Sequence, residues 1–211
     1  MGFKPRPLSE LEVERGSAVP EGVEERHSPG LAAALSALPD DRPARVLDLG
    51  AVNGANIEFH AKRGARLWVA DLVRIVDSGE IRSDELATAL PGEAEDDLFD
   101  LVLAWDVLNY LERDQVERLS SQIAGLCRPG AALLAVVITA AEMSNSPLRF
   151  TIHATESICC RATSASRRPA PNWPPAAVER CLQGFEVKRS FVLRSGVQEY
   201  VATRLDARRY R

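Results

Sequence analysis

The run VLDLGAVNGAN, residues 46–56, constrains the fold more than any other stretch of this chain. It begins with mostly apolar residues, 46–49, which suit a strand buried on both faces of a sheet. Gly50 and Gly54 follow, and residues 55–62 form an amphipathic segment typical of a helix. Glycine suits a turn whose backbone takes unusual dihedral angles or touches a ligand. The run therefore predicts a strand, a tight turn and a helix N-terminus, which together present backbone N–H groups to a bound molecule.

An acidic residue ends the next predicted strand. Residues 67–70 form a second apolar run, LWVA, and Asp71 follows it directly. In a βαβ unit, an acid at the tip of the second strand can accept both hydroxyls of a ribose. The two stretches together predict a nucleotide-type site at the carboxyl ends of neighbouring strands.

Strands and helices alternate along the rest of the chain. The apolar run 98–105 predicts a buried strand, residues 111–127 carry apolar side chains at helical spacing, and residues 131–139 predict another strand. This alternation predicts an α/β fold, a doubly wound and mostly parallel sheet covered by helices on both faces. Two apolar runs joined by a short turn, 185–193 and 197–203, indicate a C-terminal antiparallel hairpin.

The length of 211 residues suits one such domain. We expect residues 1–27 to be a loosely ordered lead-in, residues 28–205 to be the domain, and residues 206–211 to be a basic tail. Residues 140–175 lack clear periodicity and predict a long loop or lid. A third strand is expected between residues 72 and 97, where no run of the right kind stands out.

Composition narrows the possible partners. The formal net charge of −4 gives no reason to expect nucleic-acid binding, which usually shows a basic surplus. The longest apolar run, 131–141, is shorter than the roughly 20 residues of a membrane helix. The N-terminus has no apolar segment like that of a signal peptide.

The three histidines are scattered and predict no metal site. The four cysteines form no C-x-x-C pair and are expected to be free thiols in a reducing cytoplasm. Nothing indicates an oligomeric state.

Four features, in this order and spacing, resemble class I S-adenosylmethionine-dependent methyltransferases. VLDLGAVNG, from residue 46, is similar to the family's first motif, an acid-x-Gly-x-Gly-x-Gly loop around the methionine part of the cofactor. Asp71 falls where the family places its ribose-binding acid. FDLVLAWDVLNYL, from residue 99, resembles the block of the fourth strand, and CRPGAALLAVV, from residue 127, resembles the turn before the fifth.

The resemblance covers residues 30–205 and implies a Rossmann-like methyltransferase core. It implies S-adenosylmethionine as the cofactor and methyl transfer to an undetermined, small-molecule acceptor. No catalytic residue follows from it. A sulfonium methyl is already a strong electrophile, so most of the catalysis can come from positioning, and a base is needed only when the acceptor must lose a proton.

Several positions depart from the family pattern. Val52 stands where the loop has its middle glycine, and a β-branched residue there restricts the backbone and adds bulk toward the ligand. The family's third strand and its adenine-contacting acid are not recognisable, and Asp84 is only a weak candidate for that acid. Ala104-Trp105-Asp106-Val107 replaces the (D/N)PP(Y/F) motif of amino-methylating nucleic-acid enzymes.

The resemblance implies roles for residues at the predicted strand ends. Asp48 is expected to orient the turn and meet the cofactor's ammonium, Asp71 to accept the ribose hydroxyls, and Trp105 to lie against the adenine or the acceptor. The acceptor pocket is predicted to contain Asn109, Tyr110 and His153, and the residues predicted to bind the cofactor are Asp48, Gly50, Ala51, Asn53, Gly54, Asn56, Asp71, Leu72, Trp105 and Asp106.

Two other functions stay open on the sequence. The same fold can hold S-adenosylmethionine or S-adenosylhomocysteine without turnover, which Val52 and the missing third strand favour. A nicotinamide-dependent oxidoreductase is less favoured, because the glycines are spaced G-x-x-x-G rather than G-x-G-x-x-G. The site residues also have structural interpretations: Asp71 as a solvated strand-end acid, Trp105 as core, and Asp106 as a helix N-cap.

Overall fold

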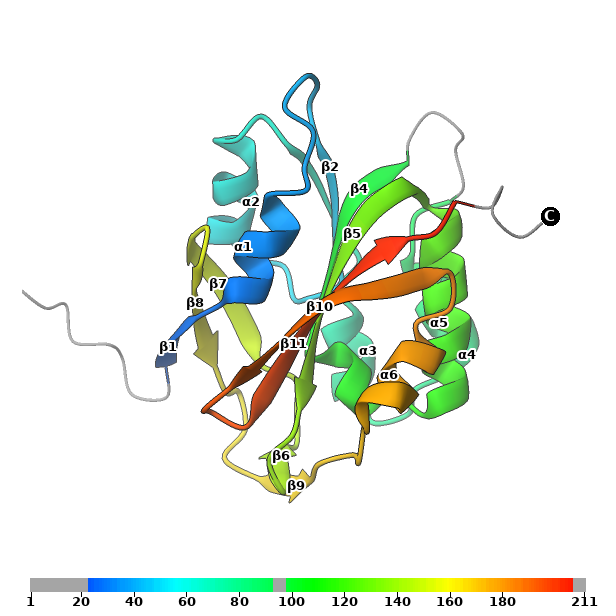
Figure 1. Ribbon diagram of the computed structural model, residues 1–211. Helices are drawn as coiled ribbons and strands as arrows, with labels where there is room; N and C mark the ends of the chain where they lie inside the picture. Colours follow the sequence, from blue (N-terminus) through cyan, green and yellow to red (C-terminus); the bar gives the residue numbers. More distant parts are fainter. Residues whose placement is uncertain (1–22, 93–97, 207–211) are drawn as a thin grey trace, which may run out of the picture.

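The computed structural model describes residues 23–92 and 98–206, and a six-stranded sheet lies at its centre (Figure 1). The strands are β2 (Arg45–Asp48), β3 (Arg66–Val69), β4 (Phe99–Trp105), β5 (Cys127–Ile138), β10 (Phe185–Leu193) and β11 (Val197–Arg204). Their order across the sheet is β10-β11-β5-β4-β2-β3. The strands from β5 to β3 run parallel, and β11 pairs antiparallel with both β5 and β10. The predicted mostly parallel sheet with a C-terminal hairpin is confirmed.

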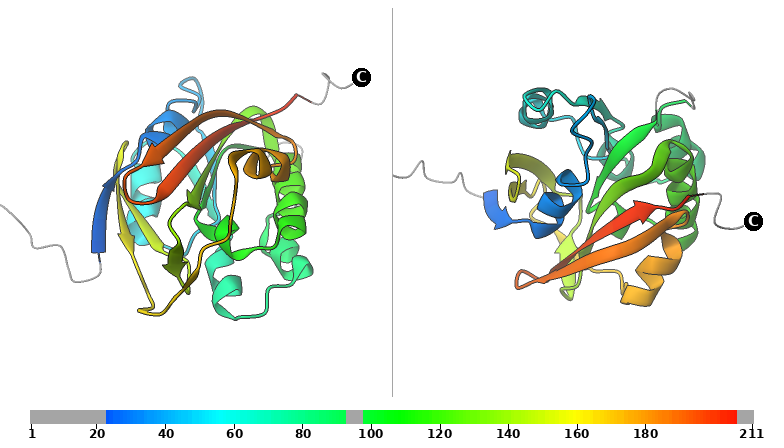
Figure 2. Two further views of the ribbon diagram at one scale, coloured as in Figure 1. Left: turned by 60° about the horizontal axis from the view of Figure 1, so that its bottom comes forward. Right: turned by 45° about the horizontal axis from the view of Figure 1, so that its top comes forward.

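Helices cover both faces of this sheet (Figures 1 and 2). One face carries α1 (Pro29–Leu35) and α2 (Gly54–Ala61), and the other carries α3 (Leu72–Asp77), α4 (Ser83–Ala89), α5 (Arg113–Gly125) and α6 (Pro175–Cys181). A short 3-10 helix, η2 (Val107–Tyr110), follows β4. Burial of all seven residues of β4 is what a central parallel strand with helices on both sides requires. Among the described residues, no helix combines the length and apolar character needed to cross a membrane.

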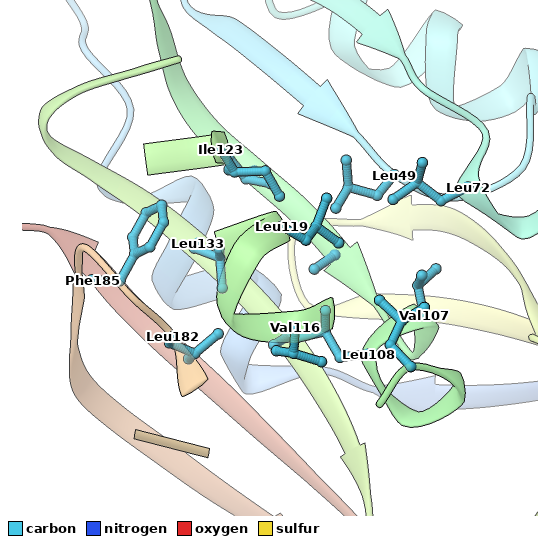
Figure 3. Packing of buried hydrophobic residues seen from close by; sticks show 14 of the residues in the cluster. Leu49, Leu72, Val107, Leu108, Val116, Leu119, Ile123, Leu133, Leu182 and Phe185 are labelled. Carbon is cyan, nitrogen blue, oxygen red and sulfur yellow. The ribbon is translucent and has the colours of Figure 1, made fainter. Parts of the chain in front are cut away.

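The larger of the two cores lies under α5 (Figure 3). Val116, Leu119 and Ile123 are buried and recur at the helical spacing that the sequence predicted. They pack with Leu133 of β5 and with Leu49 after β2. Burying each such side chain contributes about 1.5–3 kcal/mol relative to leaving it in water. This core fixes β2, β4 and β5 relative to one another, so their carboxyl ends form a rigid edge.

A buried acid fastens α1 to the sheet. Ser28 caps the helix by accepting a hydrogen bond on its Oγ from the Leu31 amide at 3.3 Å. Glu199 of β11 is 1% exposed and accepts hydrogen bonds from Ser28 Oγ and from the Gly30 amide, both at 2.6 Å. A Cβ on Gly30 would lie only 2.7 Å from Glu199 Oε2, so this close approach requires glycine. The first strand of the described chain, β1 (Val23–His27), ends directly before Ser28, so these bonds anchor its C-terminal end.

Residues 140–175 are not the long loop without regular structure that the sequence predicted. They contain β6 (Glu142–Ser144), β7 (Arg149–Ala154), β8 (Ser157–Arg161) and β9 (Arg167–Pro169). β7 and β8 form a hairpin, and β1 pairs with β8 to complete a three-stranded antiparallel sheet, β1-β8-β7. β6 pairs with β9 in a separate two-stranded ribbon.

The prediction failed because these strands are short and one partner is distant in sequence. Val23 pairs with Arg161, so no local periodicity announces the pairing. For the same reason residues 23–27 belong to the fold and not to a loose lead-in. The rest of that lead-in, residues 1–22, and the basic tail, residues 207–211, lie outside the described residues.

The expected third strand does not occur in residues 72–92, which form α3 and α4. Residues 93–97 lie outside the described part of the chain. Residues 72–77, LVRIVD, form a helix that Asp71 caps. In the described sheet β3 is consequently the edge strand, and its Trp68 is 49% exposed.

Candidate functional site

An open cleft of about 920 Å³ lies at the carboxyl ends of β2 and β3. The glycine turn forms one wall, and the three-stranded sheet β1-β8-β7 forms the other. A volume of this size is typical of a small-molecule site, and the position is where open α/β sheets bind ligands. The described residues around it are Val23, Glu25, Ala51, Val52, Asn53, Gly54, Asp71, Arg74, Asp77, Arg149, Phe150, Thr151, His153, Cys159 and Arg161.

Asp71 lines this cleft at the tip of β3, as predicted from the sequence. Its backbone is left-handed, with φ of +45°, a conformation that aspartate adopts more readily than most residues. Its Oδ1 accepts a hydrogen bond from the Arg74 amide at 3.3 Å and so caps α3. An ionised carboxylate has about four lone-pair sites, so the same group can cap the helix and accept further hydrogen bonds from a ligand.

The second half of the glycine turn is open to the cleft. Ala51, Val52, Asn53 and Gly54 all line it. Gly54 begins α2, and apart from its chain neighbours and the nearby backbone of α2, no atom of the described residues lies within 4 Å of where a Cβ on it would be. Val52 is 65% exposed, so its side chain lies free at the cleft and packs on little. Within the first turn of α2, the Ala55 amide donates to Asn53 Oδ1 at 2.9 Å, and the helix N-terminus lies beside space that a ligand can enter.

Two asparagines of this turn bind β7 and hold it in place. Asn56 is buried, and its Nδ2 donates to the Phe150 carbonyl at 3.1 Å while its Oδ1 accepts from the Ile152 amide at 2.8 Å. Asn53 donates from Nδ2 to Thr151 Oγ1 at 2.8 Å. Both asparagines belong to the predicted cofactor-binding set. In the structure they fix the opposite wall of the cleft, and only Asn53 also lines it.

The first half of the turn is closed by Trp105. The indole Nε1 donates to Asp48 Oδ1 at 2.7 Å, and the ring stacks on Phe150 with centroids 4.7 Å apart. A Cβ on Gly50 would lie 2.7 Å from Trp105 Cδ1, so the indole packs directly against this glycine. Trp105 is 1% exposed and Asp48 is also 1% exposed. The space that the missing side chain of Gly50 creates is therefore filled by protein and does not open to the cleft.

This closed half carries both electrostatic and conformational strain. Burial raises the pKa of Asp48 to about 6, against the lowering effect of the hydrogen bonds from the Gly50 amide and the Trp105 indole. Trp105 has φ of +48°, which is rare for a bulky side chain and costs on the order of 1–3 kcal/mol. Such features gather at functional sites, where the surrounding structure compensates for them.

Asp106 and Tyr110 face a different cavity, of about 370 Å³. Asp106 was predicted to bind the cofactor, and Tyr110 was placed in the acceptor pocket. Both line this second cavity and neither lines the cleft. Asn109, the other predicted acceptor residue, is buried and donates from Nδ2 to the Val136 carbonyl at 2.8 Å. His153 lies in the cleft wall, apart from Tyr110 and Asn109.

Leu72, the remaining predicted contact, is fully buried in the core and does not line the cleft.

Sequence reasoning missed the charged residues of the cleft wall, among them Arg74, Asp77 and Arg149. Arg149 pairs with Asp77 at 3.0 Å. No motif marks these residues: Arg74 and Asp77 lie on α3, and Arg149 lies on β7, which reaches the site only through tertiary contacts. Asp84, the weak candidate for an adenine-contacting acid, lies on α4 in an ion pair with Arg82 at 3.0 Å and lines no part of the cleft. Within residues 23–92 and 98–206, no group of metal-binding side chains gathers.

Comparison with solved structures establishes the fold. The 1,6-didemethyltoxoflavin-N1-methyltransferase of Burkholderia thailandensis, solved with 1,6-didemethyltoxoflavin and S-adenosylhomocysteine, is 19% identical, with a TM-score of 0.51 over 84% of this chain and 77% of that one. Magnesium protoporphyrin IX methyltransferase from Synechocystis PCC 6803, solved with S-adenosylmethionine, is 17% identical, with a TM-score of 0.50 over 83% of this chain and 77% of that one.

A protein from Listeria monocytogenes described as an S-adenosylmethionine-dependent methyltransferase gives a TM-score of 0.50 at 14% identity, over 84% of this chain and 99% of that one. Comparison with curated protein sequences found no match. A family model described as a methyltransferase domain matches residues 23–189, which include β1, the glycine turn, Asp71 and the strands of the second wall. The chain therefore belongs to the family of methyltransferase domains.

Proposed function

We propose that this protein binds S-adenosylmethionine in the cleft, with the ribose on Asp71, and transfers its methyl group to a small-molecule acceptor. The observation that supports this best is the placement of Asp71: it lies in an open cleft beside the glycine turn, in a chain of the methyltransferase family. The bound cofactor supplies a methyl group already activated by its sulfonium. The two named relatives with defined acceptors act on small molecules, and we extend that class to this chain.

The task of the protein is then to hold the cofactor in place. The Asp71 carboxylate accepts the ribose hydroxyls, and the open turn from Ala51 to Gly54 offers backbone N–H groups. Arg74, Arg149 and Arg161 balance the acids of the cleft wall. All four cysteines are unpaired, which supports a reducing cytoplasm as the place of action.

The residues fit the two parts of the cofactor unequally. The nucleoside part has an acid, a helix N-terminus and free volume. The methionine part, which the resemblance places around the glycine turn, meets the indole of Trp105 at Gly50. Binding of the whole cofactor therefore requires Trp105 to leave Gly50, which breaks its hydrogen bond to Asp48 and its stacking on Phe150. The apparent affinity for the cofactor is then the intrinsic affinity multiplied by the fraction of molecules in which Trp105 has already left Gly50.

Trp105 favours a second candidate function, a module that holds a nucleoside-containing ligand without methyl transfer. The two functions differ in how a ligand with a methionine tail compares with one without it. Methyl transfer requires S-adenosylhomocysteine to bind more tightly than adenosine, because the tail adds contacts. In a binding module whose glycine turn stays closed at Gly50, the methionine tail adds no affinity. Calorimetry with the two ligands distinguishes these functions, and methyl release from labelled cofactor in the presence of a cell extract tests turnover directly.

The proposal is tested most directly at Asp71. Asp71→Asn keeps an N-cap for α3 but loses the charge, so we expect the melting temperature to change little. Losing a charged acceptor for two hydroxyls should weaken S-adenosylhomocysteine binding by about tenfold or more, measured by calorimetry. Asp77→Asn is the matched control, because Asp77 lines the same cleft and the substitution removes the same charge. Equal affinities of Asp71→Asn and the wild type would exclude the ribose role.

A thermal-shift comparison tests the class of ligand. A ligand that binds only the folded state raises the melting temperature. S-adenosylhomocysteine is expected to raise it and NAD is not. Stabilisation by NAD alone would refute the proposed function and support a nicotinamide-dependent activity in its place.

A further inference from the structure

The three-stranded sheet β1-β8-β7 separates two cavities. Alternate side chains of a strand point to opposite faces. Glu25 and Cys159 accordingly line the cleft, while Arg26 and Cys160 line the second cavity of about 370 Å³. The second cavity is bounded elsewhere by η2, by the end of β5 and by the turn between β10 and β11. It therefore forms a compartment of its own, distinct from the cleft assigned to the nucleoside.

An acid with an unused oxygen lies in the wall of this second cavity. Asp106 is 1% exposed, and its Oδ2 accepts a hydrogen bond from the Leu148 amide at 3.0 Å. Its Oδ1 has no hydrogen-bond partner among the described residues. A buried polar atom without a partner is costly, at about 1–3 kcal/mol. Native structures rarely keep one unless a ligand or a functional role uses it.

No polar side chain among the described residues of this cavity donates a hydrogen bond to Asp106 Oδ1. Arg26 also lines the cavity, and its Nε likewise has no partner among the described residues, although its Nη2 pairs with Glu24 at 2.6 Å. The hydroxyl of Tyr110 donates instead to backbone carbonyls of residues 144 and 146. Burial raises the pKa of Asp106 to about 7, so both of its protonation states are populated near neutral pH.

We propose that this second cavity binds a small molecule that donates an O–H or N–H hydrogen bond to Asp106 Oδ1. The apolar side chains of Met143, Leu148 and Val197 in the cavity wall suit the carbon skeleton of such a molecule. That this molecule is the methyl acceptor rests on the function proposed above. Its binding at Asp106 does not, because the cavity is built without the cleft.

Three rings of one shape test the proposal without any cofactor. Aniline offers an N–H donor, phenol offers an O–H donor, and toluene offers neither. Each is titrated into the full chain labelled with ¹⁵N, and the amide signal of Leu148, which donates to Asp106, reports binding. At about pH 8, where Asp106 is mostly ionised, we expect aniline or phenol to bind about tenfold more tightly than toluene, the effect of one hydrogen bond to a charged acceptor. The ring that shows the preference identifies the donor type.

Asp106→Asn sharpens the test. An asparagine can still accept the Leu148 amide on its oxygen, but it then presents an N–H donor where Oδ1 was. We expect the preference for aniline over toluene to disappear and benzoate, an acceptor, to bind better than in the wild type. Glu142→Gln is the matched control, because Glu142 lines the same cavity, is exposed and pairs with Arg167. It should leave the preference unchanged.

The outcomes separate this inference from the proposed function. If neither aniline nor phenol is preferred over toluene, or if Asp106→Asn keeps the preference, the inference is overturned even when S-adenosylhomocysteine binds. If the donor preference holds and depends on Asp106 but S-adenosylhomocysteine does not bind, the proposed ligand site in the second cavity is supported and the proposed methyl transfer is refuted. Folding of the variant is checked by the presence of the Leu148 amide signal and by a cooperative thermal unfolding transition.

Discussion

The two halves of one glycine turn have opposite surroundings. Gly54 faces open space at the cleft, whereas Gly50, four residues earlier, lies against the indole of Trp105. Asp71 lies beside the open half with part of its surface exposed, whereas Asp48 at the closed half is 1% exposed. Both halves belong to one sequence motif. A glycine turn therefore defines only one wall of a site, and the opposite wall decides whether a ligand can enter.

The difference comes from residues far from the turn in sequence. Trp105 reaches Gly50 from the end of β4, and Phe150 of β7 stacks on its indole. Asn56, which belongs to the glycine motif, holds β7 in this position through two hydrogen bonds. The motif thus contributes to its own closure. Whether this closure is permanent or opens for the cofactor decides between the two candidate functions.

Replacing Trp105 should have the largest effect. Trp105→Ala removes a buried aromatic side chain and is expected to cost about 3–5 kcal/mol of stability, measured by denaturant unfolding. It also opens the space at Gly50. We expect S-adenosylhomocysteine to bind at least about tenfold more tightly, because the tail no longer has to displace an indole, while adenosine affinity stays unchanged.

Trp68→Ala is the control for this prediction, since Trp68 is 49% exposed on β3 and its loss should cost much less. Trp105→Phe is the milder variant should the alanine variant fail to fold. It keeps an aromatic ring but loses the donor to Asp48. Unchanged affinity for S-adenosylhomocysteine in both variants would mean that Trp105 does not control the methionine half.

The next largest effect is expected in how the free energy of unfolding depends on pH, because Asp48 in the closed half is buried. Burial raises the pKa of Asp48 from 3.8 to about 6, so the folded state holds this proton more tightly than the unfolded state does. The resulting stability is complete below about pH 4 and is lost as the pH rises through about 6. The loss amounts to about 3 kcal/mol.

Asp48→Asn provides the reference for this measurement. The amide cannot ionise, and its oxygen can still accept from the Gly50 amide and the Trp105 indole, which both donate to Oδ1 in the wild type. The stability of the variant relative to the wild type should therefore rise between pH 4 and pH 7. A difference that stays constant over this range would show that Asp48 is not strained by burial.

Much of the fold could be predicted because its signals are local. The buried strand that became β4, the helical spacing of Val116, Leu119 and Ile123, and the C-terminal hairpin each need only neighbouring residues to be recognised. The three-stranded sheet β1-β8-β7 could not be predicted. Its strands have 5 or 6 residues, and one pairing joins residues more than 130 positions apart.

The residues of the candidate site also fall into two groups: those that local sequence signals placed correctly and those whose position depends on tertiary contacts. Asp71 and the residues from Ala51 to Gly54 lie in the cleft, where a motif of adjacent residues placed them. Trp105 was expected to lie against a ligand and instead fills the space at Gly50, and Asp106 lies in another cavity. Trp105 ends β4 and Asp106 follows it, and the side on which each lies depends on the left-handed backbone of Trp105. A conformation of this kind is set by tertiary packing with Phe150 and Asp48, and no propensity of tryptophan indicates it.

The smallest change tests the open half at Val52. This residue replaces the middle glycine of the motif and is 65% exposed at the cleft, so Val52→Gly should change stability by no more than about 1 kcal/mol. Removing its branched side chain should tighten S-adenosylhomocysteine binding by about threefold, measured by calorimetry. Val52→Ala separates two causes. If bulk limits the ligand, alanine gives most of the gain, whereas if the backbone must adopt dihedral angles that only glycine reaches, alanine gives none. No gain in either variant would mean that the Val52 side chain does not hinder the ligand in the open half. Among the described residues at the glycine turn, Trp105 would then be the one that limits cofactor binding.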